Sequence, residues 1–112
     1  MTDIARAQLR ESVLQSLRVV IDPELGENLV DLGLIYRIEV DEHGSVSVDM
    51  TTTTRGCPAA GFLKNAVQSA VWIVTGVKKV EVTLTYEPRW TPERIAEALQ
   101  HKFGASVERK SR

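Results

Sequence analysis

The stretch SVSVDMTTTTRGCP, which runs from Ser45 to Pro58, decides how we expect this chain to fold. Its first half alternates apolar and polar residues, the period-two pattern of a β-strand with one buried face. We place this strand at Ser45–Thr53. Gly56 then allows a turn, and Pro58 suits the first turn of a helix. The stretch therefore predicts a strand that leads directly into a helix.

A second strand precedes this one, at Leu34–Val40. It alternates an apolar set with charged residues, and the predicted core-facing set is Leu34, Tyr36, Ile38 and Val40. Asp41–Gly44 between the two strands reads as a hairpin loop, with glycine where a positive φ is expected. The two strands must therefore pair in the antiparallel sense.

On the other side of the turn, Pro58–Thr75 has apolar residues at three- and four-residue spacing and predicts a helix. Its expected buried stripe is Phe62, Leu63, Ala66, Val67, Ala70, Val71 and Val74. A third alternating strand follows at Val77–Tyr86. Because a helical crossover separates it from the hairpin, it can lie parallel to one of the other two strands.

The two ends of the chain complete the pattern with helices. The expected core-facing residues of the first helix are Ile4, Leu9, Val13, Leu14, Leu17 and Ile21, and Pro23 is expected to end it. Thr91 is the predicted cap of a last helix whose inner face is Ile95, Ala98, Leu99 and Phe103. The prediction is an α+β fold: a two-layer sandwich in the order α-β-β-α-β-α, with a small mixed three-stranded sheet. We expect residues 1–112 to form one domain with a frayed tail at 106–112.

Composition limits the function. The net charge of −1 and the pI near 6.1 give no reason to expect a nucleic acid or an anionic membrane as partner. The polar start of the chain does not resemble a secretory signal, and the longest apolar run is too short to span a bilayer. The single cysteine excludes an internal disulfide and a complete four-cysteine metal site. A cytoplasmic location is the default expectation.

That cysteine, Cys57, is the leading candidate for chemistry. A free cysteine is most often a small buried hydrophobe. Here, however, a helix N-terminus is expected to lower the thiol pKa, and Arg55 adds positive charge nearby. Thr51 and Thr53 are expected to share one face of the strand end. No histidine is placed to act as a base, so the thiol suits a ligand or exchange role better than hydrolysis.

Two further segments carry candidate residues with ordinary alternatives. Asp22 and Glu24 lie in an acidic turn, which could be no more than a solvated loop. Tyr86 and Trp90 are candidate partner-binding residues, although an anchor that packs over the end of the sheet is the more common role for an aromatic such as Trp90.

Four motifs in order resemble the SufT/PaaD-like family of iron–sulfur cluster assembly accessory proteins. They are Asp22-Pro-Glu-Leu25, Leu29-Val-Asp-Leu-Gly-Leu-Ile-Tyr36, Met50-Thr-x-Thr-x-x-Gly-Cys-Pro58 and Tyr86-x-Pro-x-Trp-Thr91. The resemblance implies an iron–sulfur assembly-type domain with a non-enzymatic role. It implies a functional pocket of Asp22, Glu24, Thr51, Thr53 and Cys57. Arg55 departs from the proline common before the glycine, and the chain has no cysteine-rich segment of the kind that longer PaaD-type members carry.

The expected role is therefore assembly of iron–sulfur clusters or their delivery to client proteins, with Cys57 as a transient metal ligand. No cofactor is expected to be stably bound; a cluster would be held transiently. Expected partners are carrier or client proteins, and a homodimer could present two thiols. Two alternatives stay open: a thiol-dependent redox or transfer enzyme, and a purely structural adaptor within a metalloprotein maturation complex.

Overall fold

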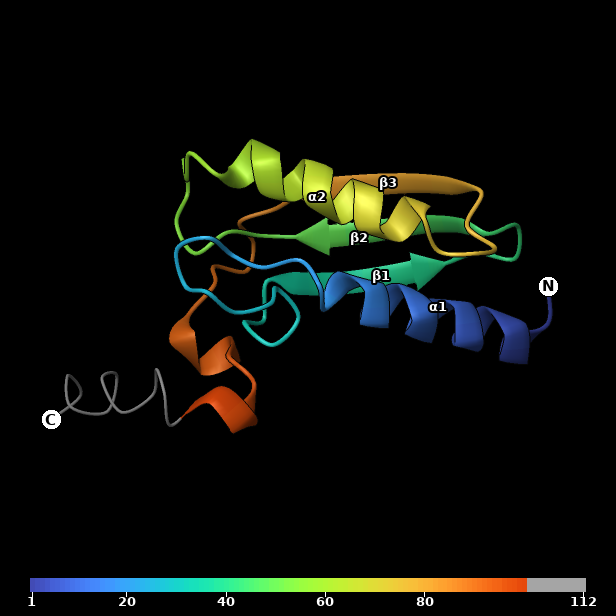
Figure 1. Cartoon of the computed structure of the whole chain (residues 1–112), viewed down its shortest axis with the longest axis horizontal. Coiled ribbons are helices and arrows are strands. Elements are labelled where there is room, and N and C mark those ends of the chain that lie inside the picture. Colours follow the sequence, from blue (N-terminus) through green and yellow to red (C-terminus); the bar gives the residue numbers. More distant parts are fainter. Residues whose placement is uncertain (101–112) are drawn as a thin grey trace, which may run out of the picture.

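A computed structural model describes residues 1–100 of the chain. Its elements, in order, are α1 (Asp3–Leu17), β1 (Ile35–Val40), β2 (Ser45–Met50), α2 (Ala60–Trp72), β3 (Lys79–Leu84) and the short 3₁₀ helix η1 (Pro92–Arg94) (Figure 1). The predicted α+β class and the order of the elements are confirmed. No helix within residues 1–100 has the length and apolar character needed to cross a membrane.

The three strands form one mixed sheet with β2 at its centre. β2 pairs antiparallel with β1 and parallel with β3, in a register that sets Val46 beside Val80 and Val48 beside Val82. The third strand therefore lies parallel to the middle strand. This arrangement requires the crossover that α2 provides.

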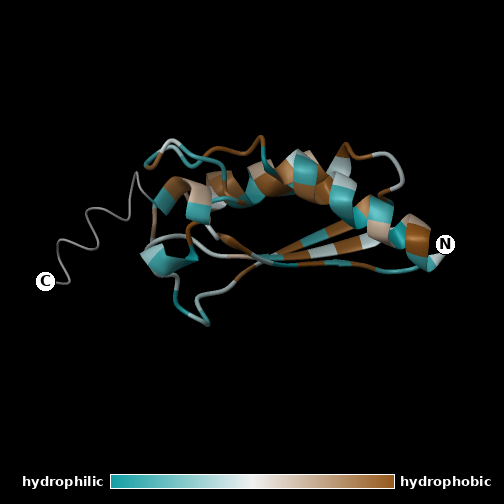
Figure 2. Ribbon diagram, turned by 90° about the horizontal axis from the view of Figure 1, so that it is seen from below, coloured by the Kyte–Doolittle hydropathy of each residue, from teal (hydrophilic) through white to brown (hydrophobic). Residues whose placement is uncertain are grey.

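Both helices cover the same face of the sheet, so the molecule has two layers (Figure 2). α1 packs on β1 and α2 packs on β3, and the core lies between these layers. Its fully buried members include Val13, Leu17, Val48, Met50, Leu63, Val67 and Val71. The opposite face of the sheet is polar: Arg37 on β1 donates to the Asp49 carboxylate on β2 at 3.0 Å. The alternation read from the sequence thus selects the buried face correctly.

The first helix is shorter than predicted. α1 ends at Leu17, well before Pro23, and the chain then turns so that the Val20 carbonyl accepts a hydrogen bond from the Leu29 N–H at 3.0 Å. Ile21 forms an isolated bridge with Asn28 and is exposed, as is Ile4 near the start of the helix. The prediction that these two isoleucines face the core is wrong: both side chains are exposed, and Ile21 lies beyond the end of α1.

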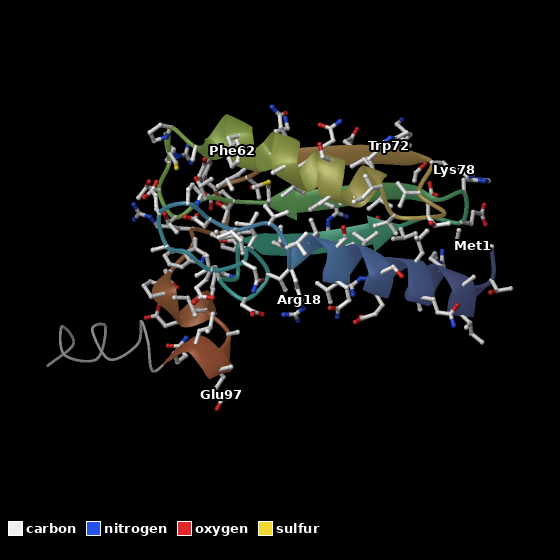
Figure 3. All side chains as sticks on the ribbon, viewed as in Figure 1. Met1, Arg18, Phe62, Trp72, Lys78 and Glu97 are labelled. Carbon is white, nitrogen blue, oxygen red and sulfur yellow. The ribbon has the colours of Figure 1, made fainter. Side chains whose placement is uncertain are left out.

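The second helix also differs at its start. α2 begins at Ala60 rather than Pro58 and has no side-chain cap, and it ends at Trp72. Phe62 is 64% exposed, so its predicted place in the buried stripe is wrong. Figure 3 marks Phe62 and Trp72 near the two ends of α2.

The strands end earlier than predicted, and β1 contains an irregularity. β2 stops at Met50 instead of Thr53, and β3 occupies Lys79–Leu84 rather than Val77–Tyr86. The register of β1 shifts between Ile35 and Arg37, which leaves Tyr36 as the extra residue of a bulge. Tyr36 therefore leaves the core-facing set, and its hydroxyl donates to the Pro88 carbonyl at 2.8 Å.

The C-terminal segment folds back against the loop before β1. η1 replaces the first part of the predicted last helix, Thr91 makes no side-chain cap, and helical structure resumes at residues 97–100. Ile95 is buried and Leu99 packs against the core, whereas Ala98 is exposed, contrary to prediction. Phe103 and the tail at 106–112 lie outside the described residues.

Gly33 allows the C-terminal segment to pack closely against the loop before β1. Gly33 has φ of +73°, and a Cβ there would meet the Arg94 carbonyl oxygen at 2.2 Å. Gly26 has the same φ with nothing within 4 Å of the added Cβ, so it provides a matched control.

We expect Gly26→Ala to lower the free energy of unfolding by about 1–2 kcal/mol, the cost of a left-handed backbone. Gly33→Ala should cost about 1–3 kcal/mol more, because η1 must move away.

Urea unfolding of both variants measures this difference. Equal losses in the two variants would show that the contact between Gly33 and Arg94 does not hold the C-terminal segment in place.

Candidate functional site

Three loops meet at one end of the sheet. Because β2 and β3 are parallel, both end on the same side, and antiparallel β1 begins there. The loop before β1, the loop from β2 to α2 and the segment after β3 therefore lie together, on the left of Figure 1. All the candidate residues predicted from the sequence are on these three segments.

Asp22 organises the acidic turn. Its side chain is buried, with 4% of the residue exposed, and Oδ1 accepts hydrogen bonds from the N–H groups of Glu24 at 2.8 Å and Leu25 at 3.0 Å. The Asp22 N–H also donates to the Glu27 carbonyl at 2.9 Å. A carboxylate that accepts such local bonds stabilises a tight turn. Asp22 thereby positions Glu24, whose own side chain remains exposed.

Glu24 reaches the cysteine. The Cys57 thiol donates to Glu24 Oε1 with Sγ and Oε1 3.4 Å apart, although 33 positions separate the two residues in the sequence. Cys57 is partly buried and follows Gly56, whose φ of +78° turns the chain at this point. The structure thus brings together three of the predicted pocket residues: Asp22, Glu24 and Cys57.

The prediction of a lowered thiol pKa is wrong. A hydrogen bond from the Ala59 backbone makes the largest single contribution and does lower the pKa of Cys57. Burial and the carboxylates of Glu24 and Asp22 together outweigh it and raise the pKa above its ordinary value. Arg55 stands apart from this pair, since its guanidinium lies over the Tyr86 ring, 5.0 Å from the centroid.

The two predicted threonines do not share a face. Thr51 is fully buried, and its N–H donates to the Leu34 carbonyl at 2.9 Å, which continues the β1–β2 pairing by one bond. Thr53 instead lines a separate cavity. The period-two rule fails here because the strand has already ended at Met50.

This cavity, of about 480 Å³, lies between the loop after β2 and the segment after β3. Its lining consists of Thr52, Thr53, Thr54, Arg55, Tyr86, Glu87, Arg89 and Trp90. Trp90 donates its indole N–H to the Leu32 carbonyl at 2.7 Å, and the Tyr86 hydroxyl hydrogen-bonds to Thr52 Oγ1 at 2.9 Å. The two aromatic residues predicted to bind a partner are therefore cavity walls fixed by hydrogen bonds.

The sequence reasoning did not single out Thr52, Thr54 or Arg89 as site residues. The sequence did contain a signal: hydroxyl side chains cluster at residues 51–54, and guanidinium groups follow this run and lie close to Tyr86. Only the parallel pairing of β2 and β3 brings these two segments to the same end. Within residues 1–100, no three His, Cys, Asp or Glu side chains are grouped so as to hold a metal ion.

Comparison with known proteins identifies the family. A family model described as iron–sulfur cluster assembly protein matches residues 10–84, which include Asp22, Glu24 and Cys57. The chain belongs to the iron–sulfur cluster assembly protein family. This agrees with the SufT/PaaD-like resemblance read from the four motifs.

Several known proteins are similar to the chain over most of its length. An Fe-S protein maturation auxiliary factor of Porphyromonas gingivalis is 42% identical over 97 residues, which cover 87% of this chain and 92% of that protein. The Fe-S protein maturation auxiliary factor SufT of Staphylococcus aureus is 35% identical over 79% of this chain and all of that protein. A solved domain of unknown function from Bacillus anthracis superposes with a TM-score of 0.85 at 32% identity, covering 92% of this chain and 98% of that one.

The contact between Glu24 and Cys57 leads to a test of the electrostatics. We expect Glu24→Gln to lower the pKa of Cys57, because the substitution removes a negative charge that opposes the thiolate. The rate of alkylation by iodoacetamide, measured against pH, reports the thiolate fraction, and its midpoint should move to lower pH.

Glu81→Gln is the matched control, since it neutralises an exposed carboxylate on β3. If both variants titrate like the unmodified chain, Glu24 does not govern the thiol.

Proposed function

We propose that this chain is a non-enzymatic accessory factor in the assembly of iron–sulfur clusters or their delivery to client proteins, with Cys57 as a transient ligand of cluster iron. Membership of the family supports this role, as do relatives named Fe-S protein maturation auxiliary factors that match along most of their length. The observation that carries the proposal is the partly exposed Cys57 thiol beside the Glu24 carboxylate, at the end of the molecule where three loops meet.

The number of ligands explains why the ligation is brief. Thiolate is a soft ligand suited to iron–sulfur clusters, which are normally held by four cysteines. This chain has one cysteine. The other ligands therefore come from outside: from a carrier protein, from a client protein, from a second copy of this chain or from a small thiol. The cluster is cargo in this proposal and not a resident cofactor.

The alternative of a thiol enzyme is less favoured. A nucleophilic cysteine works as the thiolate and is usually activated by a lowered pKa or an adjacent base. The pKa of Cys57 is raised, and the thiol lies against a carboxylate.

We place the protein in the cytoplasm as part of the proposal, because a reducing compartment keeps a lone thiol free. A purely structural adaptor differs from the proposed factor in one testable way: it would support iron–sulfur enzyme maturation without Cys57.

Replacing the thiol tests the role in cells. We expect Cys57→Ser to abolish support of iron–sulfur enzyme maturation while leaving the fold intact, because a hydroxyl is a poor ligand for cluster iron. The activity of client iron–sulfur enzymes in cells that carry only the variant is the measurement, together with the urea midpoint of the purified variant.

Ser47→Ala, a change of similar size on β2, is the control and should support normal activity. Full client activity with Cys57→Ser would favour the structural adaptor.

Reconstitution tests ligation directly. Anaerobic incubation with iron and sulfide should give the unmodified chain a cluster absorbance only together with a second thiol source, seen as a dimer or as dependence on added small thiol. Cys57→Ala should give neither the absorbance nor the dimer. A stable cluster on the monomer without added thiol would contradict the transient role.

A further inference from the structure

The cavity between the threonine loop (residues 51–54) and Trp90 carries a net positive charge, whereas the whole chain has a net charge of −1. Its lining carries two arginines and one glutamate, a net charge of +1. Elsewhere, Arg6, Arg18 and Arg37 each pair with a carboxylate. Arg10 donates to the Ile38 carbonyl, and Arg94 lies over the Tyr36 ring. Arg89 makes no ion pair or hydrogen bond within residues 1–100, and within the same residues Arg55 makes no ion pair or hydrogen bond but lies over the Tyr86 ring. Two guanidinium groups at the cavity are therefore not neutralised by the described part of the protein.

Hydroxyl groups add to these donors. Thr52 Oγ1 donates to the Thr54 carbonyl at 2.7 Å and shares a hydrogen bond with Tyr86, so it serves to hold the wall. The hydroxyls of Thr53 and Thr54, in contrast, have no partner among residues 1–100. Guanidinium and hydroxyl donors at one opening form the set that carboxylate and phosphate oxygens accept from.

The size and walls of the cavity describe the rest of the ligand. A volume of about 480 Å³ lies in the range of small-molecule sites and exceeds what a lone oxyanion fills. Trp90 and Tyr86 are held by their hydrogen bonds, so the aromatic walls exist before a ligand arrives. Aromatic rings present flat apolar surface to a flat partner.

We propose that this cavity binds a small organic anion, with a carboxylate or phosphate group at Arg55 and Arg89 and a flat apolar body against Trp90 and Tyr86. Cys57 is not part of the lining, so this site is separate from the Glu24–Cys57 pair and does not depend on the iron–sulfur role.

The two tryptophans allow a direct binding experiment on the full chain. Trp90 lines the cavity, whereas Trp72 is exposed at the end of α2 and serves as an internal reference (Figure 3). Phenyl phosphate and benzoate are the probes for the two oxyanions, followed through the indole N–H signals in ¹H–¹⁵N NMR spectra. We expect a saturable shift of the Trp90 signal with at least one probe, at a Kd below about 1 mM, and no shift of Trp72.

Control ligands and added salt distinguish the contribution of charge to binding from that of apolar contact. Inorganic phosphate should bind more weakly than phenyl phosphate, because it lacks the ring. Uncharged benzamide should not shift Trp90, and added salt should weaken binding of the charged probes. Equal binding of benzamide, a matching shift of Trp72 or no saturable shift with either probe would overturn the proposal.

Two substitutions test the arginine directly. Arg89→Gln should weaken binding by about tenfold or more, the loss of a charge-assisted hydrogen bond. Lys78→Gln removes the same charge at the opposite end of the molecule and should leave binding unchanged (Figure 3). An unshifted Trp90 signal in ligand-free Arg89→Gln verifies that the wall is intact. Equal affinity in the two variants would overturn the assignment.

Discussion

The parallel pairing of β2 with β3 is the constraint on which the rest of the structure depends. It requires a crossover, and α2 supplies the crossover and half of the helical layer at the same time. It also makes both strands end on one side of the sheet, where the Thr85 N–H donates to the Met50 carbonyl at 2.8 Å. The threonine loop follows Met50 and the segment with Tyr86 and Trp90 follows Thr85, so both begin at this hydrogen bond. The cavity exists because two strands point the same way, and a meander of three antiparallel strands would place these segments at opposite ends.

The predictions succeeded where a repeating pattern coincides with a repeating structure. Val46, Val48 and Met50 alternate along a strand that is paired on both sides, so pattern and burial agree. They failed where a tertiary contact ends or breaks the repeat. Tyr36 continues the alternation in the sequence, but a bulge rotates it toward Pro88. Phe62 lies beside the buried stripe of α2: it is 64% exposed, whereas its neighbour Leu63 is fully buried.

The candidate site shows the same division. Cys57 and its glycine turn were predictable, because Gly56 and Pro58 are neighbours in the chain. The environment of the thiol was not, since the nearest charged group belongs to Glu24, 33 positions earlier. The sequence predicted a lowered thiol pKa because the helix N-terminus and Arg55, both close in the chain, favour a thiolate. In the structure Arg55 lies over the Tyr86 ring. The Ala59 backbone still lowers the pKa of Cys57, but burial and the carboxylates of Glu24 and Asp22 outweigh it. The sign of the pKa shift is thus a tertiary property.

In the proposed roles, the three loops that meet at this end present a soft ligand on one side and a set of positive donors on the other. Asp22 is buried within its own turn, where it accepts two backbone hydrogen bonds, so it is not available as an open ligand. What faces outward is one thiol and one carboxylate on one side, and guanidinium and hydroxyl groups on the other. A permanent cluster needs four ligands, usually thiolates, and would have to enclose this end within protein. In the proposed role, a chain that offers a single thiol at a partly exposed position shares a cluster with another molecule. In the proposed role the single thiol is what limits binding by the monomer, and its partly exposed position leaves it accessible to a partner that brings the remaining ligands.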